Sequence, residues 1–430
     1  MNDGGVGRIR PKAAIRRSIK TSWLEWIVYG LTLIVLFLAV PFPVEARKLF
    51  YFACGLAGIA WAFDRKRPDT GVLLLLAALA TFALYRVAHT VAEAGTFFPT
   101  IDAWQVYLST ANRFLMGLLL IGYLSTRAPS FHERWFRALC AALMLGLIAT
   151  AVQELILHQA RGERWQRATL FAYEVTAVFF AYFGLQLMRQ INEKKHWLAP
   201  AVIGLLALGA VLWTETRTAL LCFFIGSALL IILSERIRKW KVLGVAALLG
   251  AIVLTGCYSL LVKPRLMEAQ NDISQYVSGE NRATSLGTRF ELWRASVMVF
   301  KPSPWLGGGY QQRAQIIDEA VERHRLDPVA SHYSSVNMHN ELLEELSLRG
   351  VAGGVLLLCV YFTAAALGWR RSCHAAPKNL ALLGVIFAYV FSGLTDVLFF
   401  SREATVLFIT LLAVLARAAP PGLPLRRSDA

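Results

Sequence analysis

Long apolar runs separated by short polar segments dominate the chain and predict its structural class. Each run is long enough to cross a bilayer as a helix, which takes roughly 17–25 residues. A closed β-barrel would need short segments of alternating hydrophobicity, whereas these runs are continuous. The pattern predicts an all-α polytopic membrane protein with about twelve transmembrane helices. The expected spans lie near positions 23–41, 48–63, 70–88, 103–125, 136–157, 168–188, 197–213, 218–234, 242–262, 342–367, 380–399 and 403–417.

One long polar segment interrupts this pattern and divides the chain into three parts. We expect an N-terminal transmembrane block of about nine spans (1–262), a large polar segment (263–338), and a C-terminal block of about three spans with a tail (339–430). The composition agrees, because 56% of the residues are hydrophobic and 17% are charged. A soluble domain of this length would need more charge to cover its surface.

Two amphipathic helices are predicted inside the polar segment. The first begins near Ser285, and four large apolar residues fall on one of its faces. These residues are Phe290, Trp293, Val297 and Phe300. The second carries a stripe formed by Ala314, Ile317 and Val321, and the Gly307–Gly309 run between the two helices predicts a flexible turn. We expect both helices to lie on the membrane surface.

The formal net charge of +16 sets the expected orientation through its distribution. The leader before the first span and the alternate short loops are rich in Lys and Arg, as in Arg65–Arg67 and Arg236–Lys241. Basic loops stay in the cytoplasm, so we expect both termini there and the 263–338 segment on the outer face. Nucleic-acid binding is the alternative for a basic chain, but charge spread over short loops is typical of topology, and we expect no nucleic-acid partner. We expect the first span to be an uncleaved anchor.

Arg217 is the first candidate for binding an anion. It lies at the outer tip of a helix pair and is flanked by the hydroxyl groups of Thr214, Thr216 and Thr218. A guanidinium group suits bidentate contact with phosphate. The alternative is an interfacial arginine that extends to lipid head groups.

Arg289 is the second candidate. It follows Thr288 at a predicted helix N-terminus, where backbone N–H groups and the helix dipole favour an anion. Trp293 lies one turn later and could pack against the same ligand or against lipid. The alternative for Arg289 is a surface ion pair with Glu291 or another neighbour.

His339 lies where the chain returns to the membrane, and Asn337 is expected to cap the helix that begins there. A histidine can act as a general base near neutral pH without a metal, although a lone histidine is more often structural. Asp396, near the outer end of its span, could orient His339 or neutralise an arginine. An ion pair of Asp396 with Arg402 or Arg349 is the alternative.

Several absent motifs restrict the chemistry. The sequence has no Walker loop, no dinucleotide fingerprint, no HExxH and no CxxC, so we expect neither a cofactor nor a metal site. A transfer on the outer face then needs a donor that carries its own activation and membrane anchor, as a polyprenyl-diphosphate glycan does. Two arginines would stabilise the leaving diphosphate. One base without a protein nucleophile predicts inversion at the anomeric carbon.

Four segments of the chain resemble the motifs of the O-antigen ligase and polymerase superfamily. They agree with that family in order, spacing and sidedness, from about Leu198 to the C-terminus. The segments are Thr214–Thr218, Gly287–Trp293, Pro304–Gly309, and His339–Leu343 with Gly350. The family usually has Ser where Thr216 and Thr218 flank the arginine, and the hydroxyl chemistry is kept.

The resemblance implies a membrane-embedded glycosyltransferase of the type C class at the periplasmic face of a Gram-negative inner membrane. Carried over by motif, Arg217 and Arg289 would bind the diphosphate, and His339 would activate the acceptor hydroxyl. Further residues are expected to contact or orient the substrates. These are Thr214, Thr216, Thr218, Trp293, Asn340, Arg265 and Asp396.

Within the superfamily, the chain length and the single large outer loop favour the ligase. The ligase transfers O-antigen from undecaprenyl diphosphate to lipid A–core oligosaccharide. Two alternatives come from the same family: an O-antigen polymerase and a protein O-oligosaccharyltransferase. Two come from other classes: a flippase for a lipid-linked anionic glycan, and a scaffold. Basic residues of the outer segment could meet a phosphorylated acceptor or only form surface pairs. These are Lys263, Arg265, Arg282, Arg313, Arg323 and Arg325.

Overall fold

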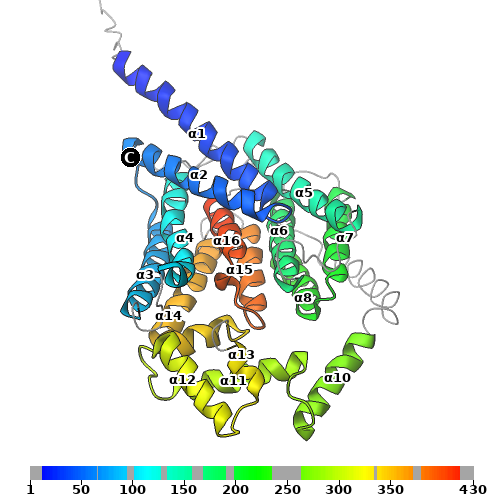
Figure 1. The fold of residues 1–430 in the computed structure, drawn as a ribbon. Coiled ribbons are helices and arrows are strands. Elements are labelled where there is room, and N and C mark those ends of the chain that lie inside the picture. Colours follow the sequence, from blue (N-terminus) through cyan, green and yellow to red (C-terminus); the bar gives the residue numbers. More distant parts are fainter. Residues whose placement is uncertain are drawn as a thin grey trace, which may run out of the picture.

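The computed structural model describes residues 12–64, 66–93, 101–126, 133–156, 168–189, 198–234, 263–333, 337–370 and 379–416. Every regular element within these ranges is a helix (Figure 1). The span expected at 242–262 lies outside the described residues.

Eight helices precede the polar segment within the described ranges, and they cover the first eight expected spans. The helix at the short span 48–63 is longer than the apolar run that predicted it. The helices are α1 (Lys12–Leu38), α2 (Pro43–Asp64), α3 (Thr70–Ala92), α4 (Ile101–Thr126), α5 (Glu133–Ile156), α6 (Ala168–Arg189), α7 (Leu198–Trp213) and α8 (Arg217–Leu233).

Four elements follow the polar segment within the described residues, and the last of them lies in the middle of the bundle in Figure 1. They are α14 (Glu341–Arg370), α15 (Leu380–Ser392), the short 3₁₀ helix η4 (Leu398–Phe400) and α16 (Arg402–Leu415). The prediction of one continuous span over 380–399 is wrong, because the helix ends at Ser392 and an irregular return follows. Carbonyl groups of this return accept hydrogen bonds from α14, since the Glu341 N–H donates to Gly393 O at 2.7 Å.

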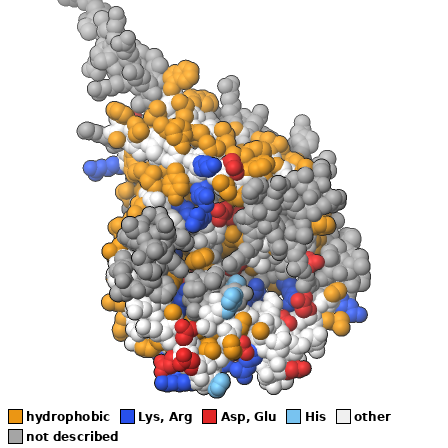
Figure 2. All heavy atoms as spheres, viewed as in Figure 1, with side chains coloured by type: hydrophobic (Ala, Val, Ile, Leu, Met, Phe, Trp, Pro, Cys, Tyr) orange, Lys and Arg blue, Asp and Glu red, His pale blue; other side chains and the backbone are white. Residues whose placement is uncertain are grey.

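The surface of the bundle suits a lipid environment. In the described part of the chain, three helical segments are both long and apolar enough to cross a membrane, judged by length and composition: Thr70–Ala92, Ala168–Met188 and Glu341–Trp369. Large apolar side chains face outward from the bundle, with Phe63 79% and Phe362 74% exposed. In Figure 2, apolar side chains cover much of the bundle, and charged side chains gather toward the lower part. The prediction of an all-α polytopic membrane protein is confirmed.

Phe399 of η4 fixes the irregular return at the centre of the bundle. Its ring lies 5.1 Å from that of Phe114 and 5.0 Å from that of Phe408, between centroids, and it is fully buried. Its N–H donates to Oε2 of Glu341 at 3.0 Å. Aromatic packing and this hydrogen bond together hold residues 393–400 against the start of α14.

The polar segment folds into a layer of helices beneath the bundle in Figure 1. We call residues 263–333 the polar layer. It contains α10 (Lys263–Ser278), α11 (Ser285–Phe300), α12 (Gly309–Glu322) and α13 (Pro328–Tyr333). Helices α11 and α12 are the two that the sequence predicted, whereas α10 and α13 were not predicted.

Helix α11 buries a different face from the predicted one. Leu292, Ala295 and Val299 are fully buried in the small core of the polar layer. The predicted apolar stripe lies on the other side, where Val297 is 49% exposed. The helix therefore has two apolar faces, and the second is open to a ligand or to lipid.

A cluster of buried charges attaches α12 to α3 and α14, and we call it the buried junction. Arg86 Nη1 lies 2.7 Å from Oε1 of Glu345, which also accepts from Arg349 at 3.1 Å. Arg313 Nη1 lies 3.0 Å from Oε2 of Glu344. Arg313 was predicted as a surface residue that could meet an acceptor, and this is wrong because its side chain is 0% exposed.

Glycines allow two chain segments to cross at this junction. Gly307 has φ +75° and Gly350 has φ +61°, and a Cβ on either would lie within 2.6 Å of backbone atoms of the other segment. The Val351 N–H donates to Pro304 O at 2.7 Å across the crossing. The interpretation of Gly307 as part of a flexible turn is therefore wrong, because close backbone contact fixes it.

Candidate functional site

Arg217 is the first residue of α8 and follows a tight turn built from threonines. The Thr214 hydroxyl donates to Val211 O at 2.7 Å and lies 3.0 Å from the Thr216 hydroxyl. Both threonines are buried, and Glu215 between them has φ +55°. The hydroxyl groups thus shape the turn that presents Arg217 at a helix N-terminus.

The guanidinium of Arg217 contacts a carboxylate of the polar layer. Its Nη2 lies 2.8 Å from Oε2 of Glu268 on α10. The side chains are 31% and 44% exposed, so water reaches both. The sequence did not single out Glu268, because nothing in the pattern of α10 indicates which element it faces.

Arg289 lies one turn inside α11 rather than at its first residue. The helix begins at Ser285, the Thr284 hydroxyl caps the Gly287 N–H at 3.1 Å, and Asp272 Oδ2 accepts from the Leu286 N–H at 3.2 Å. These caps occupy N–H groups that were expected to attract an anion. Attraction of an anion here rests on the guanidinium of Arg289, for which no ion pair is present among the described residues.

His339 occupies a constrained backbone position before α14. Its φ is +48°, and its N–H donates to Oδ1 of Asn337 at 3.0 Å. Asn340, not Asn337, caps α14 by accepting from the Leu343 N–H at 3.0 Å, which corrects the predicted cap. Asn340 also donates to Leu394 O at 2.9 Å. Left-handed backbone at a non-glycine residue is costly and is frequent at functional sites.

Asp396 lies beside the imidazole of His339. Its Oδ1 is 3.8 Å from His339 Nδ1 and accepts from the Val397 N–H at 2.8 Å. Its Oδ2 accepts from the Thr169 hydroxyl at 3.2 Å. Arg349 pairs with Glu345 instead, so the alternative of an Asp396–Arg349 pair is wrong.

Tyr173 of α6 connects the separate parts of the site. Its buried hydroxyl lies 2.8 Å from that of Thr395 and also interacts with the Thr218 hydroxyl. Asp396 and Arg289 both lie within electrostatic range of it. Thr169 and Tyr173, four residues apart on an apolar helix, share one face, and this spacing was the signal that could have revealed them.

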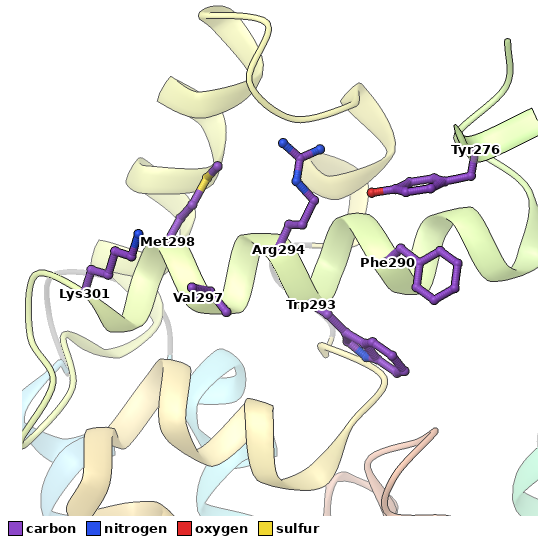
Figure 3. A pocket seen from close by; sticks show the side chains of 7 residues that line it. All are labelled: Tyr276, Phe290, Trp293, Arg294, Val297, Met298 and Lys301. Atoms are coloured by element: carbon purple, nitrogen blue, oxygen red, sulfur yellow. The ribbon is translucent and has the colours of Figure 1, made fainter. Parts of the chain in front are cut away.

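Trp293 lines an open groove along the exposed face of α11 (Figure 3). Phe290, Val297 and Met298 line the same groove, with Tyr276 of α10 at one end and Arg294 and Lys301 among the lining. The groove has a volume of about 500 Å³. The Trp293 Nε1 is buried and has no hydrogen-bond partner among the described residues.

The central part of the chain matches a known family. Residues 201–358 match the family model described as O-Antigen ligase. The O-antigen ligase of Escherichia coli strain K12 is 29% identical over 219 residues, which cover 50% of this chain and 49% of that protein. An uncharacterized protein of Haemophilus influenzae is 25% identical over 223 residues, 49% of this chain and 54% of that protein. Over this central part, the chain is similar to the O-antigen ligase superfamily.

The resemblance drawn from the motifs is thus confirmed. The chain spans about half the length of the curated relatives it matches. The matched range contains Arg217, Arg289 and His339, whereas Tyr173 and Asp396 lie outside it.

Several of the predicted site residues lie close to Tyr173. Thr218, Arg289 and Asp396 each interact with Tyr173, and His339 lies beside Asp396. Trp293 lies in the groove beyond them, and the side chain of Arg265 is outside the described residues. No group of three His, Cys, Asp or Glu side chains suited to a metal occurs in the described part of the chain.

Proposed function

We propose that the protein transfers O-antigen glycan from undecaprenyl diphosphate to a sugar hydroxyl of lipid A–core oligosaccharide. The observation that supports this most is the convergence of three distant motif segments around Tyr173. These segments supply a guanidinium (Arg289), a hydroxyl beside a second guanidinium (Thr218), and the His339–Asp396 pair. Cations beside a base suit the displacement of an anionic leaving group by a hydroxyl.

His339 is the proposed general base. The Asp396 carboxylate faces Nδ1 and would orient the ring so that Nε2 accepts the proton of the acceptor hydroxyl. The acceptor oxygen then forms a bond to the anomeric carbon, and the bond from that carbon to the phosphate oxygen breaks. The electron pair leaves with the diphosphate, so the configuration at the anomeric carbon inverts.

Arg217 and Arg289 are the proposed diphosphate ligands. The positive charge that they supply would stabilise the charge developing on the leaving group, so the transfer would need no metal ion. The groove along α11 extends away from Arg289, and its aromatic residues offer surfaces on which sugar rings of the acceptor could pack. Thr214 and Thr216 would act indirectly, through the turn that presents Arg217.

The proposed location is the periplasmic face of a Gram-negative inner membrane. Basic alternate loops favour cytoplasmic termini, and this orientation would place the polar layer in the periplasm. Membrane lipids would surround the bundle, and both substrates would reach the site from the membrane plane.

The test is transfer by the purified full-length protein. The mixture contains undecaprenyl-diphosphate-linked glycan and lipid A–core, with a chelator and without nucleotide. His339→Ala is expected to lower turnover roughly 100- to 10,000-fold, as loss of a general base does. His332→Ala, which removes an exposed histidine of the polar layer, is the matched control.

The products separate the alternatives. Glycan on lipid A–core, made only with His339 intact and with inverted configuration, supports the ligase. Longer undecaprenyl-linked chains would identify a polymerase. A protein that moves the lipid without forming a glycosidic bond would contradict the enzyme and favour a flippase.

A further inference from the structure

A carboxylate forms an ion pair with the guanidinium of Arg217, the group that the proposed function assigns to phosphate binding. Glu268 Oε2 lies 2.8 Å from Nη2 of Arg217. A bidentate grip on phosphate uses two nitrogen atoms of one guanidinium, so a donor that binds Arg217 in this way must displace Glu268. Because both side chains are partly exposed, such an exchange does not require opening a buried ion pair.

The hydrogen bonds that join α10 to α11 lie away from Glu268. Asp272 and Tyr276 join α10 to α11, through the Leu286 N–H at 3.2 Å and Glu291 at 2.8 Å. Both anchors lie in the C-terminal half of α10, whereas Glu268 lies in the N-terminal half. The neighbouring Leu266 and Met267 are 55% and 54% exposed, so little packing restrains this half. Glu268 can therefore move away while the anchors of α10 stay in place.

The charge of the ligand decides whether the exchange is favourable. The head groups of most anionic membrane lipids are phosphodiesters with one negative charge, which match the single charge of Glu268. They gain little by replacing it, and a tethered carboxylate has the advantage of high local concentration. A diphosphate carries more charge and interacts more strongly with Arg217 and Arg289 together.

We propose that Glu268 is a specificity-determining residue, which keeps singly charged lipid head groups off Arg217 and yields to the diphosphate of the donor. This inference rests on the proposed role of Arg217 as a diphosphate ligand. Glu268 acts through Arg217 and takes no part in the transfer itself.

The experiment measures binding of undecaprenyl diphosphate, without glycan, to the full-length protein in nanodiscs. One set of nanodiscs contains only zwitterionic lipid, and the other also contains phosphatidylglycerol. In zwitterionic lipid, Glu268→Gln is expected to bind the diphosphate about 2- to 5-fold more tightly than the wild type. This factor corresponds to the energy of the exposed ion pair that the ligand no longer has to break. Phosphatidylglycerol is expected to weaken binding by this variant and to leave the wild type little changed.

Two further variants complete the design. Glu268→Asp keeps the carboxylate and is expected to restore the wild-type resistance to phosphatidylglycerol. Glu280→Gln removes one exposed acidic group of the same polar layer and serves as the charge-matched control. Thermal unfolding of each variant in the same nanodiscs verifies that the fold is kept.

The outcomes distinguish this inference from the proposed function. If Glu268→Gln binds as the wild type does in both lipids, or more weakly in zwitterionic lipid, the inference is overturned. The proposed function survives that result as long as Arg217→Ala loses affinity for undecaprenyl diphosphate. If Arg217→Ala binds normally, both the diphosphate role of Arg217 and the inference are overturned.

Discussion

Two of the contacts between the polar layer and the bundle differ in chemistry. At the buried junction, Arg313 of α12 and Glu344 of α14 have side chains 0% and 3% exposed, and they meet at 3.0 Å. At the other contact, Arg217 and Glu268 are 31% and 44% exposed and meet at 2.8 Å. The distances are nearly equal, but the solvent exposure is not.

Exposure decides what each contact can do. A buried ion loses its hydration, so removal of its partner leaves an uncompensated charge and is costly. An exposed pair exchanges its partner for water or for another anion at little cost. The buried junction therefore fixes the position of the polar layer, and the Arg217–Glu268 contact leaves a ligand site available.

The largest expected effect comes from breaking the buried junction. Glu345→Ala leaves Arg86 and Arg349 without the carboxylate that they share, and we expect a loss of about 3–5 kcal/mol in the free energy of unfolding. Thermal and denaturant unfolding in detergent measure it. Glu319→Ala, which removes an exposed partner of Arg323, is the control and should change stability by less than about 1 kcal/mol. Equal effects of the two variants would contradict the comparison.

The glycine crossing beside the junction gives the next largest effect. Gly350 has φ +61° and ψ −162°, which is accessible essentially only to glycine, so Gly350→Ala should cost at least about 1–3 kcal/mol. The new Cβ would also lie 2.6 Å from Trp305 O. Gly209→Ala is the control, because no atom lies within 4 Å of its Cβ position and alanine favours a helix. If both variants unfold at the same temperature as the wild type, the close backbone contact at the crossing does not stabilise the fold.

The sequence predicted the helices wherever a long apolar run carried the signal. It failed at 393–400, where an apolar stretch is buried as irregular backbone, because hydropathy does not separate a span from a buried return. It also failed at Arg313, which occupies the buried face of α12. Its partner Glu344 is 31 residues away in sequence, and no local pattern reveals such a pairing.

The candidate site was predicted in part. Arg217, Arg289 and His339 could be named because each lies at the end of a span or the start of a predicted helix. Tyr173 and Glu268 could not, since their importance depends on which elements pack together. Contacts between side chains from distant segments depend on the tertiary fold, whereas the periodicity of the sequence indicates only local secondary structure.

A smaller effect on stability is expected within the polar layer, at the buried carboxylate of Glu291. Burial alone would raise the pKa of Glu291, but hydrogen bonds from the Asp327 N–H, Tyr276 and Arg294 outweigh it and lower the pKa. This stabilisation is fully present above the ordinary value of 4.5 and is lost as the pH falls through the lower folded-state pKa. Hydrogen exchange at pH 7 and below pH 4.5 should show α10 and α13 loosening from α11 in acid.

Glu291→Gln provides the control for that experiment. Glutamine does not titrate, so the exchange rates of α10 and α13 in this variant should depend less on pH after correction for intrinsic rates. Equal acid sensitivity in the variant and the wild type would assign the loosening to other groups.

The smallest effect on stability is expected at the Arg217–Glu268 contact. Glu268→Gln should change the free energy of unfolding by less than about 1 kcal/mol, because the pair is exposed and gains little over hydration. About 1 M salt reduces the screening length to roughly 3 Å, so it should remove even this difference. The effect of Glu345→Ala should persist in the same salt, because ions do not reach the buried junction. Unfolding curves of both variants at low and high salt give the comparison directly. A large loss of stability in Glu268→Gln that persists in high salt would show that this contact is structural. The two contacts would then not differ in the way their exposure indicates.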